Sequence, residues 1–155
     1  MQIALTRDHN KSAIWISSLI GLIVSGYLTY VKLFNQPIYC TPGLGDCQTV
    51  NSSQWSELWG IPIALFGMVC YLAVLLLVFI GPRLPLLKKY NEFFVFGIGT
   101  FGFLFSLYLT YLELFIIKTI CQWCLVSAIC MTIIFIFSII NLRKSQYQQK
   151  AKRRR

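Results

Sequence analysis

The stretch Cys121-Gln-Trp-Cys124 opens the last long apolar segment of the chain, at residues 120–142. Two thiols in the C-x-x-C spacing can close into a disulfide or share a metal ion. In the first turn of a helix, free N–H groups and the helix dipole also favour thiolate over thiol. The stretch therefore predicts a reactive thiol pair where a long apolar helix begins.

The composition places the chain among membrane proteins. Of its 155 residues, 57% are hydrophobic and 12% are charged, and the mean hydropathy is +0.66. The net charge is +9, but the basic residues lie in blocks between apolar runs. Such blocks are typical of topology signals, so we expect an integral membrane protein that binds no nucleic acid.

Four apolar runs are each long enough to cross a bilayer. They predict transmembrane helices over residues 13–34, 61–80, 93–112 and 120–142. The first run is too long for a signal-peptide core and lacks a small-residue cleavage site, so we expect it to be retained. Pro62 is expected in the first turn of the second helix, where its missing N–H costs nothing. The predicted fold is an all-α bundle of four transmembrane helices, with residues 1–155 as one domain.

The one sizeable polar connection between helices, residues 36–60, follows the first helix. Its first part is rich in Pro and Gly and holds Cys40 and Cys47, which predicts an irregular loop. Residues 48–58 contain a tryptophan and predict a short helix at the membrane surface. Residues 113–119 are expected to form a very short link, in which Glu113 is exposed, pairs with Lys118 or relays protons.

Positive charge is distributed unevenly between the connections. The N-terminus, the second connection and the tail (residues 143–155) are basic, whereas the first and third connections carry no net positive charge. The positive-inside rule therefore places both termini and the second connection in the cytoplasm. Four cysteines are then expected on the outer, periplasmic face of a plasma (inner) membrane, where disulfides persist: Cys40, Cys47, Cys121 and Cys124.

Two thiol pairs on one face of a helical bundle suggest an electron relay by thiol–disulfide exchange, with one mobile pair and one fixed pair. The loop pair can move, whereas the helix pair is held rigidly. The nearest electron sink within a bilayer is a lipid-soluble quinone of the ubiquinone or menaquinone class. Cys124 lies one turn deeper than Cys121 and is the better candidate to face that quinone.

Other interpretations of the cysteines stay open. Two cysteine pairs are a format of structural zinc sites, but a C-x-x-C at a helix start with a widely spaced second pair is a poor zinc ribbon, and we expect no metal. Static disulfides that brace the outer loops would instead make the chain a small membrane scaffold or accessory protein. Cys70 and Cys130 lie inside apolar runs and are expected to be packing residues.

The chain resembles the vitamin K epoxide reductase family, in its compact bacterial form, over nearly its whole length. The resemblance rests on the order and spacing of Cys40, Cys47, Ser53, Trp55, Gly60-Ile61-Pro62-Ile63-Ala64-Leu65-Phe66-Gly67, Ser106-Leu107-Tyr108-Leu109 and Cys121-x-x-Cys124. The functionally analogous disulfide bond formation protein B carries its C-x-x-C in the first outer loop. The reversed order here separates this chain from that protein.

The resemblance implies a four-helix bundle with a quinone bound among the outer helix ends. It implies that Cys40 exchanges with a thioredoxin-like partner, that Cys47 attacks Cys121, and that Cys124 then reduces the quinone.

Three further residues are candidates for contact with the quinone. The resemblance implies that Ser53 hydrogen-bonds near the ring or steadies the loop, and a helix-cap role for Ser53 is equally open. Phe66 and Tyr71 are candidates for ring contacts, although aromatic residues in membrane helices mostly serve packing.

The chain also departs from the family. Many bacterial relatives carry a fused thioredoxin-like domain after the fourth helix, whereas this sequence continues into a basic tail. We therefore expect a separate thioredoxin-like or disulfide-oxidase-like partner. The animal enzymes place a tyrosine four residues after the C-x-x-C and an asparagine near the start of helix two. Ala128 and Ile63 stand at those positions, which favours simple quinone reduction over epoxide reduction.

Overall fold

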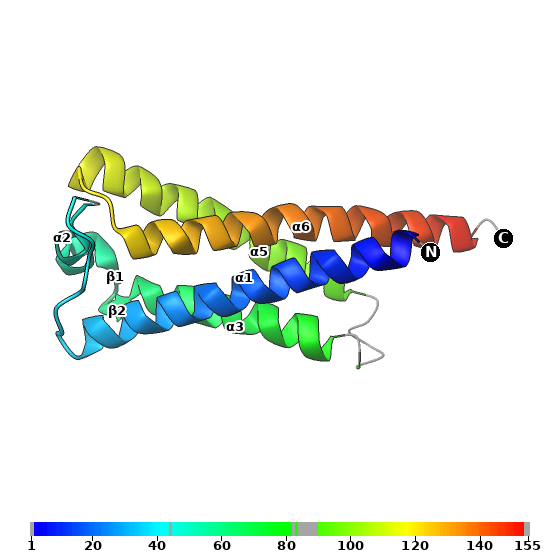
Figure 1. Cartoon of the computed structure of the whole chain (residues 1–155), viewed down its shortest axis with the longest axis horizontal. Coiled ribbons are helices and arrows are strands. Elements are labelled where there is room, and N and C mark those ends of the chain that lie inside the picture. The colour runs from blue at the N-terminus through cyan, green and yellow to red at the C-terminus, as the bar shows by residue number, and fades with distance from the viewer. Residues whose placement is uncertain (1, 44, 82, 84–89, 154–155) are drawn as a thin grey trace.

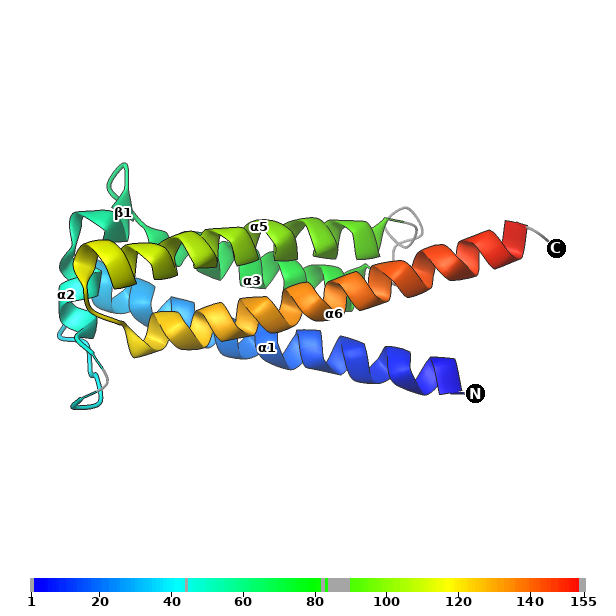
Figure 2. The same ribbon diagram turned by 90° about the horizontal axis from the view of Figure 1, so that it is seen from above.

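The computed structural model describes residues 2–43, 45–81, 83 and 90–153. Four long helices run alternately up and down: α1 (Gln2–Leu33), α3 (Ile63–Ile80), α5 (Asn91–Tyr111) and α6 (Gln122–Arg153) (Figure 1). The α1–α3 and α5–α6 connections lie at one end of the bundle, and both ends of the described chain lie at the other (Figure 2). We refer to the end of the bundle that carries these two connections as the cysteine end.

Each long helix contains a stretch that is long and apolar enough to cross a membrane. These stretches are Asn10–Leu33, Ile63–Ile80, Asn91–Ile117 and Gln122–Tyr147. The predicted bundle of four transmembrane helices is therefore confirmed.

The helices begin and end elsewhere than predicted. Helix α1 already begins at Gln2, and α6 continues to Arg153, so most of the predicted basic tail is helical. No glycine or proline interrupts residues 143–153, and Lys, Arg and Gln are good helix formers. Pro62 is the residue before α3 rather than part of its first turn. Lys88 and Lys89 of the second connection, and the last two tail residues, lie outside the described residues.

The prediction of a short link after residue 112 is wrong. Helix α5 continues into a π-helical turn, η2 (Leu112–Ile117), because that segment is apolar apart from Glu113. Lys118 ends the turn in the left-handed conformation, with φ of 58°. The backbone N–H groups of Lys118 and Thr119 both donate to the Glu113 carbonyl oxygen.

The predicted interfacial helix over residues 48–58 is present but shorter, and it forms part of a cap over the cysteine end. The cap consists of α2 (Cys47–Ser52), a 3-10 turn η1 (Gln54–Ser56), and a hairpin of β1 (Glu57–Leu58) and β2 (Ile61–Pro62). Trp59 and Gly60 form the hairpin turn with φ of 55° and 79°. A two-residue turn with both φ values positive matches the twist of a hairpin.

Helix α1 is the most enclosed of the four. It packs against both α3 and α6, while α5 packs mainly on α6 and less on α3. Half of its membrane stretch is buried, against 11% in α3. Its buried face mixes apolar residues with five polar ones, which are Asn10, Ser17, Ser18, Ser25 and Thr29.

Two close contacts bring these helices together. Asn10 Nδ2 donates to Asn141 Oδ1 of α6 at 3.1 Å. Gly21 of α1 lies directly against the Tyr71 ring of α3, where a Cβ would overlap the ring. Small residues allow this kind of close approach between membrane helices.

Candidate active site

The four cysteines predicted to act together meet at the cysteine end. Cys40 and Cys47 form a disulfide with a Cα–Cα distance of 6.0 Å, and Cys121 and Cys124 are free thiols. Cys47 and Cys121 are 0% and 1% exposed and belong to one apolar cluster, against which Cys40 and Cys124 pack. An oxidised pair and a reduced pair therefore share one water-excluded cluster.

Cys47 was predicted to lie in the irregular loop. In the structure it is the first residue of α2. Asp46 caps this helix, because its carboxylate accepts hydrogen bonds from the Thr49 N–H, at 3.1 Å, and from the Thr49 hydroxyl. These hydrogen bonds from Thr49 hold the pKa of the Asp46 carboxyl below its usual value. The cap fixes the position of Cys47.

The segment that carries Cys40 is docked onto the start of α6. The Trp123 indole N–H donates to the Tyr39 carbonyl oxygen at 2.9 Å. The Thr41 N–H donates to Gln122 Oε1 at 3.2 Å. Gly45 has φ of 104° and lies so close to Ile120 that a Cβ would overlap the Ile120 carbonyl. Tyr39, Thr41 and Gly45 therefore lie against the beginning of the C-x-x-C helix.

The helix pair begins α6 as predicted. Cys121 immediately precedes the helix, and its carbonyl oxygen accepts from the Leu125 N–H at 3.0 Å. The side-chain hydrogen bond with Cys124 is the main influence that lowers the pKa of the Cys121 thiol, assisted by the N–H groups of Cys124 and Trp123. The thiolate preference expected of a helix start therefore falls on Cys121.

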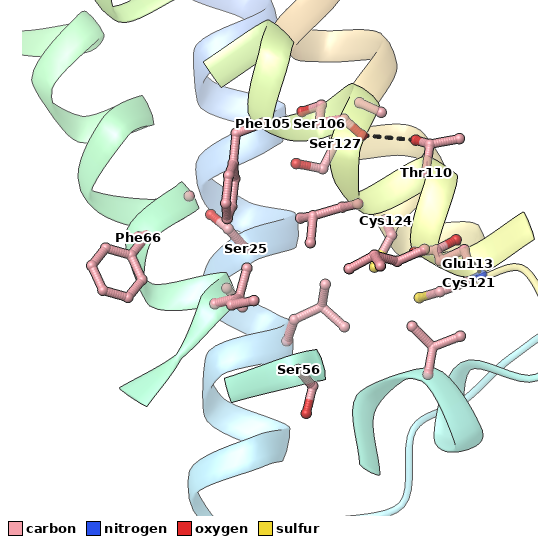
Figure 3. Close-up of a pocket in the computed structure, with 18 of the residues that line it drawn as sticks. Ser25, Ser56, Phe66, Phe105, Ser106, Thr110, Glu113, Cys121, Cys124 and Ser127 are labelled. Carbon is pink, nitrogen blue, oxygen red and sulfur yellow. Dashed lines mark hydrogen bonds between the residues drawn. The ribbon is translucent and has the colours of Figure 1, made fainter. Parts of the chain in front are cut away.

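A cavity of about 260 Å³ lies beside the C-x-x-C pair. Side chains of all four long helices and of the cap line it, and most of them are apolar (Figure 3). Cys121 and Cys124 lie at one side of it. The residues at the positions that differ from the animal enzymes, Ile63 and Ala128, line it as well.

The three other residues predicted to contact a ligand also line the cavity. Phe66 is 42% exposed. Tyr71 is fully buried, and its hydroxyl donates to the Ser127 carbonyl oxygen at 2.7 Å. Ser53 is the residue after α2, and its hydroxyl donates to the Val50 carbonyl oxygen at 2.8 Å. Ser53 thus combines both of its expected positions, at the helix end and at the cavity wall.

For two residues of the site, the structure shows contacts that were not predicted from the sequence. Glu113 is buried, with 6% of its surface exposed, and lines the cavity. Among the described residues, no ion pair joins it to Lys118, so the expected pairing or exposure is wrong. A carboxylate eight residues before a cysteine pair gives no spacing signal of its own, because the intervening π-helical turn cannot be read from the sequence.

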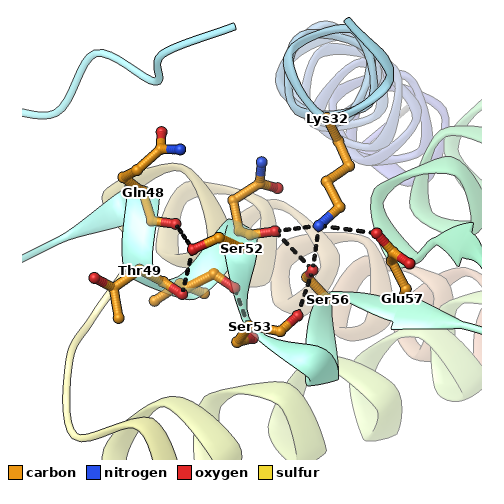
Figure 4. A network of polar contacts seen from close by, with 9 residues as sticks. Lys32, Gln48, Thr49, Ser52, Ser53, Ser56 and Glu57 are labelled. Carbon is orange, nitrogen blue, oxygen red and sulfur yellow. Dashed lines mark hydrogen bonds and ion pairs between the residues drawn. The ribbon is translucent and has the colours of Figure 1, made fainter. Parts of the chain in front are cut away.

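Lys32, at the end of α1, ties the cap to the bundle. Its Nζ donates to the Asn51 carbonyl oxygen at 2.6 Å and to Ser56 Oγ at 2.9 Å, and pairs with Glu57 Oε1 at 3.0 Å (Figure 4). The only sequence signal was a single lysine near the end of the predicted helix over residues 13–34, which is otherwise uncharged.

The chemistry of the site is that of thiols. Across the described ranges, no group of three or more His, Cys, Asp or Glu residues is placed to hold a metal ion. The arrangement can instead pass a disulfide from one cysteine pair to the other beside an apolar cavity.

Comparison with known proteins agrees with this chemistry. The family model described as the vitamin K epoxide reductase family matches residues 12–139. The thiol-disulfide oxidoreductase LTO1 of Arabidopsis thaliana is 32% identical over 133 residues, which are 83% of this chain and 35% of the relative. The chain thus spans about a third of the length of that curated relative. The match covers all four membrane stretches in part or whole and both cysteine pairs, and the chain belongs to the vitamin K epoxide reductase family.

Proposed function

We propose that this chain is a membrane thiol oxidoreductase that passes electrons from a dithiol partner through its two cysteine pairs to a quinone. The reaction would support disulfide bond formation outside the cytoplasm. The observation that carries the proposal is the buried cluster in which the Cys40–Cys47 disulfide packs with Cys121, next to an apolar cavity.

The exposure of the cysteines supports an order for the exchange steps. Cys40 is half-buried and Cys47 is fully buried, so a partner thiolate attacks Cys40 and releases Cys47 as thiolate. The second thiol of the partner then attacks its bond to Cys40, which releases the oxidised partner and leaves Cys40 as thiolate. Cys47 attacks Cys121 of the oxidised helix pair and releases Cys124. Attack of Cys40 on Cys47 in the Cys47–Cys121 mixed disulfide restores the loop disulfide and leaves the helix pair reduced.

The cavity suits a lipid-soluble ring. Its lining is mainly apolar, it reaches both thiols of the helix pair, and Ser53 and Phe66 stand on its wall. A bound quinone of the ubiquinone or menaquinone class supplies a two-electron acceptor. Within this proposal, Ser53 and Phe66 hold the ring, and Cys124 is the thiol that faces it.

The membrane orientation is part of the proposal. The N-terminal end of α1 and the C-terminal end of α6 lie at the end of the bundle opposite the four cysteines. Lys11 belongs to the N-terminal third of α1, Arg143 and Lys144 to the C-terminal third of α6, and Arg83 follows α3. The positive-inside rule then places the cysteine end on the outer, periplasmic face of a plasma (inner) membrane. The partner is a separate thioredoxin-like protein on that side.

The central experiment reconstitutes the purified chain with a quinone and a reduced thioredoxin-like protein and follows quinone reduction by absorbance. Wild type should turn over, and Cys121→Ala should not. Unchanged turnover in that variant would refute the relay.

A second experiment identifies the partner. With Cys47→Ala, Cys40 is a free thiol that can attack the disulfide of an oxidised partner, and the resulting mixed disulfide should persist because Cys47 is not there to resolve it. A disulfide-linked species that disappears on reduction is expected. Four outer cysteines that resist mild reductant and trap no partner would instead indicate a scaffold with static disulfides.

A further inference from the structure

A carboxylate is buried beside the C-x-x-C pair, inside a membrane stretch. Glu113 belongs to the stretch Asn91–Ile117 and lines the same cavity as Cys121 and Cys124. In the described part of the chain, no lysine or arginine lines that cavity. Ionisable groups buried in this way are costly, and they mark proton or ion pathways in membrane proteins.

Glu113 lies beside the C-x-x-C pair. Its Oε2 accepts a hydrogen bond from the Cys121 backbone N–H at 3.1 Å. Figure 3 shows Glu113, Cys121 and Cys124 together at one side of the cavity that all three line. The other titratable side chains that line this cavity are Cys70 and Tyr71 of α3. Cys47 of α2 packs in the same cluster as Cys121 but is held in the disulfide.

The local fold needs the oxygen atoms of Glu113 but not its charge. The carbonyl oxygen holds the π-helical turn by accepting from Lys118 and Thr119, and the side chain accepts from one backbone N–H. A neutral glutamine oxygen would accept that N–H equally well. The ionisable group therefore has a use beyond the turn, and π-helical turns are frequent at functional sites.

We propose that Glu113 is the proton acceptor for the Cys124 thiol. Its carboxylate takes the thiol proton as the helix pair gives up its electrons, and returns the proton to the reduced acceptor. The inference rests on the function proposed above and adds to it the residue that moves the proton.

The reaction balances as one dithiol and one quinone giving one disulfide and one hydroquinone. Two S–H bonds break and one S–S bond forms between Cys121 and Cys124, and two electrons pass to the acceptor. The Cys124 proton travels through Glu113 to one acceptor oxygen. The Cys121 proton leaves to water at the cysteine end, and one proton from that water reaches the other oxygen. Glu113 ends as carboxylate.

The test uses the reduced full chain without quinone, so it reads the proton acceptor separately from quinone reduction. Iodoacetamide alkylates Cys124, and peptide mass spectrometry follows this residue alone. In wild type, the alkylation rate should change less than about threefold between about pH 6 and about pH 8, because Glu113 removes the proton during the attack. In Glu113→Gln the rate at about pH 6 should be about 100-fold lower and rise about tenfold per pH unit, since only the thiolate fraction reacts.

Two variants calibrate this result. Glu113→Asp keeps a carboxylate on a shorter side chain and should give an intermediate rate with the shallow pH profile. Glu92→Gln removes a carboxylate at the opposite end of α5 and should behave as wild type. Wild-type rates in Glu113→Gln would overturn the proposal. A lower rate with an unchanged shallow profile would also overturn it, because the carboxylate would then serve shape alone.

A further measurement uses the wild-type chain and therefore does not depend on the folding of a variant. Alkylation of wild-type Cys124 in heavy water should be slower by about twofold to threefold, because a proton moves in the attacking step. Equal rates in both solvents would overturn the proposal. A wild-type chain that shows this behaviour but reduces no quinone would refute the proposed function and leave the role of Glu113 standing.

Discussion

Cys40 lies in an extended segment bounded by prolines and glycines, whereas Cys124 lies in the first turn of a helix of 32 residues. The first pair is closed as a disulfide and the second is open, although both pack into one buried cluster. The segment around Cys40 has no regular secondary structure and is held by its contacts with the start of α6, while Cys124 is part of a long helix that lines the cavity. Under the proposed function, the loop pair exchanges with the partner and the helix pair delivers the electrons.

The largest effect is expected when a cysteine of the helix pair, Cys121 and Cys124, is replaced. Cys124→Ala should lower quinone reduction by about three orders of magnitude, because no other thiol can complete the helix disulfide. Cys130→Ala, a buried cysteine six residues further along α6, should keep the rate within about threefold and lower the unfolding free energy by about 1 kcal/mol. Steady-state turnover with a reduced partner measures the first effect and chemical unfolding the second. Substantial turnover in Cys124→Ala would show that the loop pair delivers electrons by itself.

The contact between the two regions can be loosened at Gly45. Gly45→Ala forces an alanine into φ of 104° and a Cβ into the Ile120 carbonyl, so it should destabilise the docked loop by about 2–4 kcal/mol. Transfer from the loop pair to the helix pair should slow by about tenfold or more in single-turnover measurements. Gly43→Ala also has a positive φ, of 88°, but meets no atom within 4 Å, so it should cost about 1 kcal/mol. Equal effects of the two substitutions would contradict the docking.

The attachment of the cap to α1 can be tested at Lys32. Lys32→Met keeps the length of the side chain but removes the donor to Ser56 Oγ and one of the two donors to the Asn51 carbonyl oxygen, the other being the Ser56 hydroxyl. The unfolding free energy should fall by about 1–3 kcal/mol, and proteolysis within residues 47–58 should accelerate. Glu57→Gln removes only the half-exposed partner and should cost less than about 1 kcal/mol. A larger loss from Glu57→Gln than from Lys32→Met would contradict this assignment.

The smallest effect concerns the cap of α2. The Asp46 carboxyl has a lowered pKa in the folded chain, so its contribution to stability is present above the unfolded pKa and is lost as the pH falls through the folded pKa. Protection of the α2 amides against hydrogen exchange should therefore decrease between about pH 5 and about pH 2. Asp46→Asn keeps a cap but has no charge to titrate, so its protection should not show this pH dependence. The same decrease in both proteins would exclude Asp46 as its cause.

The sequence predicts the number of long helices well, because long apolar runs are strong signals. It also places both cysteine pairs at one end, since the two crossings by α3 and α5 return Cys121 to the side of Cys47. The hairpin at Trp59 and Gly60 was missed, because a tryptophan with positive φ gives no turn signal of the usual kind.

The position of Glu113 was missed for a different reason. The helix that carries it continues through a π-helical turn before the chain reverses at Lys118. A pattern of apolar residues does not distinguish such a turn from a link, so a buried carboxylate was taken for an exposed one. Lys32 illustrates the same limit, since its three partners lie 19 to 25 residues away along the chain.

The polar residues on the inner face of α1 have a consequence for the biosynthesis of the chain. This helix is made first, yet its serines and Thr29 are enclosed only by helices made later, and the partner of Asn10 lies at residue 141. Until α3 and α6 have emerged from the ribosome, these residues have only lipid, translocon or chaperone as neighbours. We therefore expect α1 to reach its final surroundings only when the last helix is complete, and a chain cut before Asn141 should be degraded faster than the full chain.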